Sequence, residues 1–331
     1  MTTTTANGKG LKKFFRSISI PPVYYFLIAI FFGGGLLDLF YAGGQIFGNP
    51  AIMLNILVRS VALGIVAVGQ TMVIVGGSID LSVVYVISLT SVMSSYVMQG
   101  EASNVPKAIL LVFLMGAGVG LVNGLIITKL KVNSFITTLG TSLIISGIIN
   151  STFSNWEGSV PRSFEFFGYA TVGPIPFSVI ILFLMIFAGW FVLSRTKFGA
   201  HLYGVGGNEE VARLSGLRTD RVLIIAHVIC SLTAVLTGLF IVSRLRAGAP
   251  WVGPDGYYDL ESIATTVVGG TLLAGGKGGV WGTLAGVLIF SILDTTFNQL
   301  GVNPYLSIVF RGLIIVLAVA SYTIRSKKEA A

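Results

Sequence analysis

The segment 269–279 surrounds Lys277 with glycines, a composition that first suggests a phosphate-binding loop. Such a loop requires Gly-x4-Gly-Lys followed by Ser or Thr, because the hydroxyl group binds Mg²⁺ while backbone N–H groups hold the phosphates. Here Gly278 follows the lysine, and no strand is expected before it. The segment therefore predicts a flexible hairpin between two half-helices and no ATP site. Its candidate helix breaks are Gly269, Gly270, Gly275 and Gly276.

Metal binding and nucleophilic catalysis have little support. The chain contains two histidines, His201 and His227, and one cysteine, Cys230. These residues match no metal-ligand spacing, and one cysteine cannot form an intrachain disulfide. No nucleophile and base form an obvious constellation. We therefore predict no catalytic residue and no metal site, and we expect His227 to hydrogen-bond a neighbouring helix.

A second glycine-rich segment places Asp80 between two long apolar runs. A charged side chain at the centre of a membrane helix costs roughly 2.5–3.5 kcal/mol, and the preceding Gly76 and Gly77 disfavour a continuous helix. Asp80 is suited to cap a helix that begins at Leu81. Two interpretations remain open. One is a break within a spanning helix, with Asp80 and Ser82 at the break, and the other is an ordinary turn in a cytoplasmic loop.

A short polar segment between two other apolar runs predicts a complete small helix over residues 208–216. The residues at each end suit a helix terminus by type and by charge. They are Asn208 as the cap, Glu209 and Glu210 in the first turn, Arg213 in the last turn, and Ser215 with Gly216 at the end. Val211 and Leu214 form a small apolar stripe between these polar residues. A well-capped helix in a loop is suited to contact a partner protein.

These segments must be positioned by an unusually apolar chain. Of its 331 residues, 54% are hydrophobic and 10% are charged, and the mean hydropathy is +0.88. Soluble domains contain roughly 25% charged residues. We therefore predict an all-α fold, a polytopic membrane helix bundle in which no loop is long enough for a soluble catalytic domain.

The apolar runs define the expected spans. A helix that crosses the bilayer needs roughly 20 apolar residues, and about ten runs approach this length. They are 22–40, 51–75, 81–98, 108–127, 134–151, 176–193, 222–242, 262–273, 280–297 and 305–322. The eighth run is short and predicts a re-entrant or broken span.

The basic residues predict the orientation of these spans through the positive-inside rule. Clusters of Lys and Arg lie before the first span, after the fourth, after the sixth and behind the last. An even number of spans places all of them, with both termini, on the cytoplasmic side. The net charge of +8 is explained by this topology and gives no support for nucleic-acid binding. The opposite loops mix both signs, with Glu101, Glu157, Arg162, Glu165, Asp255 and Asp259.

Three regions follow from this topology. Residues 1–21 form a basic cytoplasmic segment, whose apolar stripe suits either the inner membrane surface or a disordered tail. Residues 22–323 form the membrane domain, with its longest basic loop at 195–221. Residues 324–331 form a cytoplasmic tail.

Two further patterns concern helix packing. Gly116, Gly120 and Gly124 form successive GxxxG motifs, which let membrane helices approach closely. Asp294 and Arg311 flank the last two spans, and we expect a structural ion pair between them rather than contact with a solute. Neither pattern indicates a nucleotide site.

Three segments together resemble the permease subunits of bacterial ABC importers for ribose, xylose, arabinose and galactose. The segment 76–83 is similar to the family's GGIDLSVG signature. The segment 206–216 is similar to its G-x-N-x-x-A-A-x-L-S-G loop, and 259–276 to its ELDAIAAVVIGGTSLSGG segment. The resemblance covers nearly the whole chain after the N-terminal segment and leaves the choice of sugar open. The chain departs from these signatures at Ser78, Val84, Asp259 and Glu261.

The resemblance implies a division of labour among several proteins. A periplasmic solute-binding protein delivers a monosaccharide, and two permease chains, identical or different, form the path through the lipid of the bacterial inner membrane. ATP and Mg²⁺ bind to a separate ABC ATPase subunit, so no cofactor is expected on this chain. The helix at 208–216 would be the coupling helix that contacts the ATPase. The glycine breaks, with Asp80 and Ser82, would border the translocation path.

Two alternative functions are compatible with the spans. An ABC permease of this type could carry a nucleoside, a branched-chain amino acid or a signalling molecule. An ion-driven secondary transporter would instead relay protons through buried acids such as Asp80 and Asp294. The capped loop helix discriminates between these classes, because a secondary transporter does not need it.

Overall fold

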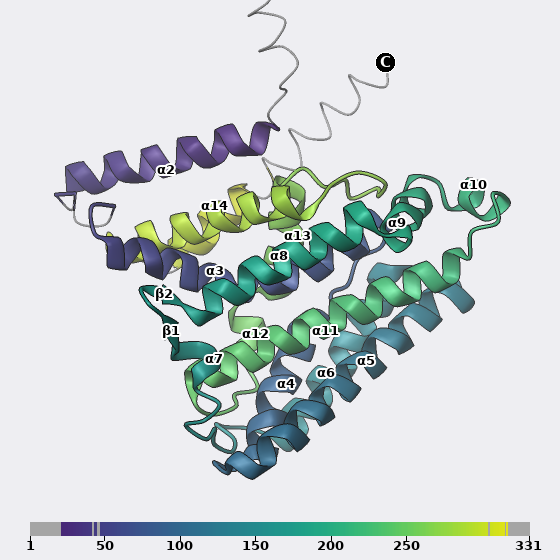
Figure 1. Cartoon of the computed structure of the whole chain (residues 1–331), viewed down its shortest axis with the longest axis horizontal. Coiled ribbons are helices and arrows are strands. Elements are labelled where there is room, and N and C mark those ends of the chain that lie inside the picture. The colour runs from purple at the N-terminus through teal and green to yellow at the C-terminus, as the bar shows by residue number, and fades with distance from the viewer. Residues whose placement is uncertain (1–20, 42, 45–46, 304, 315, 317–331) are drawn as a thin grey trace, which may run out of the picture.

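The computed structural model describes residues 21–41, 43–44, 47–303, 305–314 and 316. Within these ranges seven helices are long and apolar enough to cross a membrane, and Figure 1 shows their arrangement. They are α2 (Pro22–Tyr41), α3 (Pro50–Val75), α5 (Val105–Lys129), α6 (Ser134–Thr152), α8 (Phe177–Arg195), α11 (Thr219–Leu245) and α14 (Val280–Gln299). The predicted all-α membrane bundle is confirmed.

Three of the expected spans are shorter helices. α4 (Val83–Met98) has 16 residues and α13 (Tyr258–Val268) has 11. The last expected span contains a helix over Tyr305–Ile314, and most of its remainder lies outside the described residues. At roughly 1.5 Å per residue, α13 covers about half of the hydrocarbon thickness. The eighth expected span is therefore a half-length helix, as its short apolar run predicted.

The remaining elements are short and connect the spans. A two-stranded antiparallel hairpin follows α7, with Thr171 opposite Pro176. In chain order these elements are η1 (Ala102–Asn104), α7 (Phe166–Tyr169), β1 (Thr171–Val172), β2 (Ile175–Pro176), α9 (Lys197–Gly207), α10 (Glu209–Leu214) and α12 (Val252–Asp255). They leave no separate soluble domain within the described part of the chain.

α11 lies at the centre of the bundle and packs against α3, α4 and α5. Small residues allow this packing, because lipid provides no hydrophobic force that drives helices together. A Cβ atom on Gly120 of α5 would lie 2.6 Å from the carbonyl oxygen of His227, and one on Gly124 would lie 2.7 Å from the Cα atom of Ile224. Gly118, on another side of α5, has no such neighbour within 4 Å. The packing role predicted for the GxxxG motifs is confirmed.

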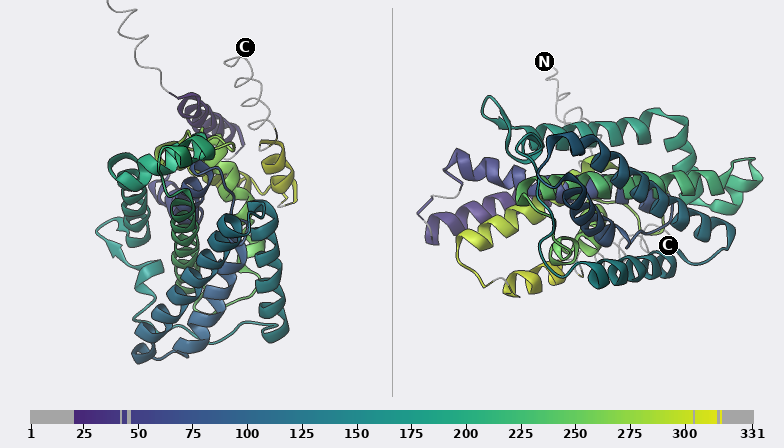
Figure 2. Two further views of the ribbon diagram at one scale, coloured as in Figure 1. Left: turned by 90° about the vertical axis from the view of Figure 1, so that its right-hand side faces the viewer. Right: turned by 90° about the horizontal axis from the view of Figure 1, so that it is seen from below.

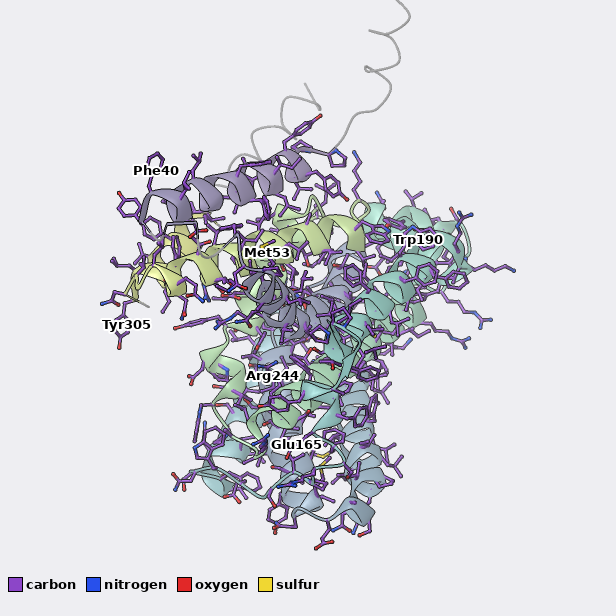
Figure 3. The ribbon with its side chains drawn as sticks, turned by 60° about the vertical axis from the view of Figure 1, so that its left-hand side comes forward. Phe40, Met53, Glu165, Trp190, Arg244 and Tyr305 are labelled. Carbon is purple, nitrogen blue, oxygen red and sulfur yellow. The ribbon has the colours of Figure 1, made fainter. Side chains whose placement is uncertain are left out.

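Large apolar side chains cover the helix faces that turn away from the bundle. In the apolar window of α2 17% of the residues are buried, against 67% for α11, which distinguishes a peripheral span from a central one. Figure 3 shows Phe40 and Tyr305 at one end of the bundle and Trp190 toward the other. The ring centroid of Trp190 lies 5.6 Å from the guanidinium carbon of Arg195. Aromatic residues are enriched where spans meet the membrane–water interface, which fits this placement.

The two ends of the bundle differ in charge. The right-hand end in Figure 1, seen directly in the left panel of Figure 2, holds α9, α10 and the start of α11. We call it the basic end, and its place on the cytoplasmic side stays a prediction of the positive-inside rule. Asp255 and Asp259, expected in the loops of the opposite side, lie on α12 and α13. The basic segment before Pro21 and the tail 324–331 lie outside the described residues. The basic residues of this end include Lys129, Lys131, Arg195, Lys197, Arg213, Arg218 and Arg221.

Candidate functional site

α10 lies at the basic end between α9 and α11, where the sequence predicted a capped helix. The side-chain oxygen of its N-cap, Asn208, accepts a hydrogen bond of 3.0 Å from the backbone N–H of Val211. Acidic and basic residues occupy its first and last turns, and Ser215 Oγ donates to the Val211 carbonyl at 2.8 Å. Gly216 then has a φ of +85°, a left-handed conformation that glycine adopts at little cost. The predicted local structure is confirmed.

The side chains of α10 divide into two sets. Val211 and Leu214 point away from the bundle, with exposed fractions of 57% and 83%. Glu209 forms an ion pair with Arg213 and lies 3.6 Å from Lys131 Nζ. The apolar stripe is therefore accessible to a partner. Glu209 and Arg213, two of the polar residues on either side of that stripe in sequence, form ion pairs within the chain.

The first glycine break lies between α3 and α4. α3 ends at Val75, and Gly77 has a φ of +79°. The chain then runs without regular structure to Val83, where α4 begins. Apart from Gly77 and Ile79, the residues of the segment 76–82 are buried. The break is therefore buried, but it follows the full-length α3 instead of interrupting a span, so neither interpretation left open by the sequence describes it completely.

Asp80 lies within this break and is fully buried. Its carboxylate accepts hydrogen bonds from the backbone N–H and the hydroxyl of Ser82, at 2.9 and 2.6 Å, and lies 3.1 Å from His227 Nδ1 on α11. The other ring nitrogen lies 2.9 Å from Ser78 Oγ. The expectation that Asp80 caps a helix beginning at Leu81 is corrected, because α4 begins at Val83. Asp80 instead binds Ser82, the residue just before this helix. His227 was expected to hydrogen-bond a neighbouring helix, but its ring contacts Ser78 and Asp80 in the irregular segment between α3 and α4.

The hydrogen-bond network around Asp80 extends to residues that the sequence analysis did not identify. Asn123 of α5 donates to Ser82 Oγ at 2.9 Å and accepts from Thr141 Oγ1 of α6 at 2.6 Å. Asn123 is fully buried. An asparagine inside an apolar, glycine-rich run was the available signal, because an amide without partners is costly in lipid. The network joins three helices, α5, α6 and α11, to the irregular segment before α4.

The second glycine segment packs against the first. The backbone N–H of Gly276 donates to the Val75 carbonyl at 2.9 Å, and a Cβ atom on Gly275 would lie 2.8 Å from the Cα atom of Gly77. A Cβ atom on Gly206 of α9 would overlap the same Val75 oxygen. Three segments far apart in sequence thus meet at one place. We call the four glycines at 77, 206, 275 and 276 the glycine junction.

The loop that follows α13 is a hairpin held against α9. The backbone N–H of Leu272 donates to the Lys277 carbonyl at 3.0 Å, which closes the loop on itself. The hydroxyl of Tyr203 donates to the Gly278 carbonyl at 2.7 Å. Burial raises the pKa of Tyr203, so its phenol remains a protonated donor at neutral pH. The predicted hairpin is present, but the expectation of two half-helices on either side of it is corrected, because α14 is long enough to cross the membrane and only α13 is half-length.

Gly269 and Gly270 lie apart from the glycine junction, at the end of α13. A Cβ atom on Gly269 would lie 2.5 Å from the carbonyl group of Gly282, so this glycine allows α13 to pack on α14. Gly270 has a φ of +92° and turns the chain into the hairpin. The four glycines that the sequence assigned to one flexible segment therefore have two different environments.

A charged cluster lies between α13, α14 and the helix over Tyr305–Ile314. Arg311 Nη2 lies 2.6 Å from Asp294 Oδ1, which confirms the predicted ion pair, and Arg311 Nη1 also donates to Glu261. Glu261 was not expected in this cluster, although an acid within an apolar run is itself a signal. One guanidinium thus neutralises two largely buried carboxylates. Among the described residues, no group of three or more His, Cys, Asp or Glu side chains could hold a metal ion.

Comparisons with known proteins identify relatives over most of the chain. The family described as "Branched-chain amino acid transport system / permease component" matches residues 52–319. The ribose import permease protein RbsC of Escherichia coli K12 is 36% identical over 272 residues, which cover 81% of this chain and 84% of the relative. RbsC of Bacillus subtilis 168 is 36% identical over 280 residues, 82% and 85% of the two chains. The galactose/methyl galactoside import permease MglC of Haemophilus influenzae is 33% identical over 325 residues, 92% and 94%. No solved structure matches the chain.

Proposed function

The chain belongs to the family of branched-chain amino acid transport system permease components, and we propose that it is the membrane-spanning subunit of an ABC importer for a monosaccharide. In this proposal it forms the path across the bacterial inner membrane together with a second permease chain. A periplasmic binding protein delivers the sugar, and a separate ATPase subunit binds ATP and Mg²⁺. Relatives of 33–36% identity that are named as ribose or galactose permeases support a sugar over an amino acid as the cargo.

The exposed apolar stripe of α10 is the observation that carries this proposal. Val211 and Leu214 are exposed at the basic end, on a helix that is capped and held in place. Apolar side chains surrounded by polar ones are typical of the centre of a protein interface. An ATPase subunit on the cytoplasmic side would accept this stripe in a groove.

The glycine junction connects this proposed contact to the spans. α10 is joined directly to α9, whose Gly206 packs on the end of α3 and on the hairpin after α13. Closure of the ATPase would displace α10, and the displacement would reach both helix breaks through α9. The spans would then rearrange between outward-open and inward-open states. The proposed path lies beside these breaks, at Gly76, Gly77, Asp80, Ser82, Gly269, Gly270, Gly275 and Gly276.

Reconstitution tests this proposal. Vesicles that contain the chain and its ATPase, with the binding protein outside and ATP inside, are assayed for uptake of ribose, xylose, arabinose, galactose and leucine. We expect ATP-dependent uptake of a monosaccharide. Leu214→Asp should release the ATPase and abolish uptake, whereas Leu214→Met, which keeps an apolar side chain, should retain both.

Two results would contradict the proposal at different levels. Uptake of leucine and of no sugar would change the cargo while leaving the ABC mechanism intact. Solute movement by the purified chain alone, driven by an ion gradient without an ATPase, would replace the mechanism itself.

A further inference from the structure

The basic end contains a network of ion pairs that the proposed docking of α10 does not use. Its centre is Asp220, in the first turn of α11. The carboxylate of Asp220 lies 2.6 Å from Lys129 Nζ, 3.6 Å from Lys131 Nζ and 4.0 Å from Arg213 Nη2. Lys131 also lies 3.6 Å from Glu209 of α10. These five side chains, which we call the ionic strut, link α10 to the end of α5 and to the start of α11.

Lys131 has an unusual backbone conformation. It follows the end of α5 with a φ of +54°, in the left-handed region that non-glycine residues seldom adopt. Glycine or asparagine would adopt this conformation at lower cost. A strained backbone persists where surrounding contacts hold it, and the ion pairs of Lys131 with α10 and α11 are contacts of this kind. The backbone conformation at position 131 favours glycine or asparagine, and the lysine there adds a positive charge that neither of them would provide.

The ionic strut and the proposed docking surface occupy opposite sides of α10. With 3.6 residues per turn, Glu209 and Arg213 share one side, and Val211 and Leu214 lie on the other. Glu210 is exposed and forms no ion pair within the described part of the chain. A partner that binds the exposed side of α10 therefore contacts a helix whose opposite side forms ion pairs with the chain just after α5 and with α11.

We propose that the ionic strut transmits the displacement of α10 to α5 and α11, with Lys131 and Asp220 as positioning residues. This inference rests on the proposed function, because it requires an ATPase that moves α10. Without the strut, α10 stays joined to α9 and α11 along the chain, and its displacement reaches α5 only through the packing of α5 on α11. Each exposed ion pair contributes little alone, so transmission depends on the pairs that share one carboxylate.

The test compares Lys131→Asn with Lys131→Arg in the reconstituted complex. Asparagine accepts the left-handed backbone and removes the charge, whereas arginine retains the charge. We expect Lys131→Asn to keep the ATPase bound and active, while the sugar imported per ATP falls about fivefold, as for a modest coupling between two sites. Asp220→Asn should cause the same loss. Because it changes the net charge in the opposite direction, a shared loss identifies the network and not the surface charge.

A distance measurement provides a readout that does not depend on transport. Cys230, the only cysteine in the sequence, is buried, so spin labels attach selectively to cysteines introduced at exposed positions. Leu130→Cys and Ser215→Cys place such labels at the end of α5 and just after α10. With an intact strut we expect a narrow distribution of label distances, and with Lys131→Asn a broad one.

The outcomes separate this inference from the proposed function. Equal import per ATP and equally narrow distance distributions in Lys131→Asn and Lys131→Arg would overturn the strut. If the Lys131→Asn variant does not assemble, import per ATP and the distance distribution are measured on Asp220→Asn instead, and the same results would overturn the strut. The proposed function fails differently: the unmodified complex then imports no sugar with ATP, or Leu214→Asp leaves the ATPase bound.

Discussion

His227 Nδ1 lies 3.1 Å from Asp80 Oδ2, although 147 residues separate the two along the chain. Both side chains are fully buried. Ionisable groups at membrane depth are retained where they pair with one another or with other polar groups, and Ser78 and Ser82 complete this arrangement. The pair therefore fastens the irregular segment before α4 to the central helix α11.

Removal of the histidine is expected to leave a buried charge without its partner. We expect His227→Leu to lower the free energy of unfolding by about 3–5 kcal/mol, the usual effect of breaking a buried pair. Asp80→Asn combined with His227→Leu should recover part of this loss, because no buried charge remains. Thermal unfolding midpoints in detergent measure both. A double variant no more stable than His227→Leu would contradict this role of the pair.

Close backbone packing at the glycine junction predicts a sharp difference between two neighbouring residues. A methyl group on Gly206 would overlap the Val75 carbonyl oxygen, whereas one on Gly207 would have no neighbour within 4 Å. We expect Gly206→Ala to destabilise the protein by about 1–3 kcal/mol and to reduce sugar import. Gly207→Ala is the matched control and should remain near the unmodified protein in both assays. Identical behaviour of the two variants would refute the junction.

The packing of α5 on α11 can be tested in the same way. Gly120→Ala places a methyl group 2.6 Å from the His227 carbonyl oxygen, and Gly118→Ala places one in open space. The first is expected to cost about 1–3 kcal/mol of stability. The second should be neutral or stabilising by about 0.5–1 kcal/mol, because alanine is the better helix former. Unfolding in detergent, followed by tryptophan fluorescence, compares them, and the reverse order would contradict this contact.

The charged cluster at Arg311 is expected to be structural. Arg311→Leu leaves the carboxylates of Glu261 and Asp294 without a cation and should cost about 3–5 kcal/mol, while Arg311→Lys should cost less. A variant that also carries Glu261→Gln and Asp294→Asn removes all three charges and should regain stability. Sugar import should recover together with the unfolding midpoint. Recovered stability without recovered import would instead place the cluster in contact with the solute.

Much of the architecture could be predicted from local patterns. The length of an apolar run determines whether a helix can cross the bilayer, and this sufficed for the bundle and for the half-length α13. The cap of α10 was equally predictable, since Asn208 reaches a backbone N–H only three residues away. The first residue of a helix was less predictable. Asp80 is of a residue type that suits a helix cap, but its buried contact with His227 is a tertiary one, and α4 begins at Val83.

The amino-acid sequence by itself thus determined the membrane class, the seven full-length spans and the capped loop helix, because each depends on residues within a few turns of one another. Tertiary structure alone decided that Gly206 meets Gly77 and Gly275, that Asn123 and Glu261 complete buried polar clusters, and that Arg213 faces the bundle. The physical reason is that lipid is as apolar as the side chains facing it. The apolar pattern therefore does not determine which helices pack together. Close contacts at small residues and hydrogen bonds between buried polar groups determine it.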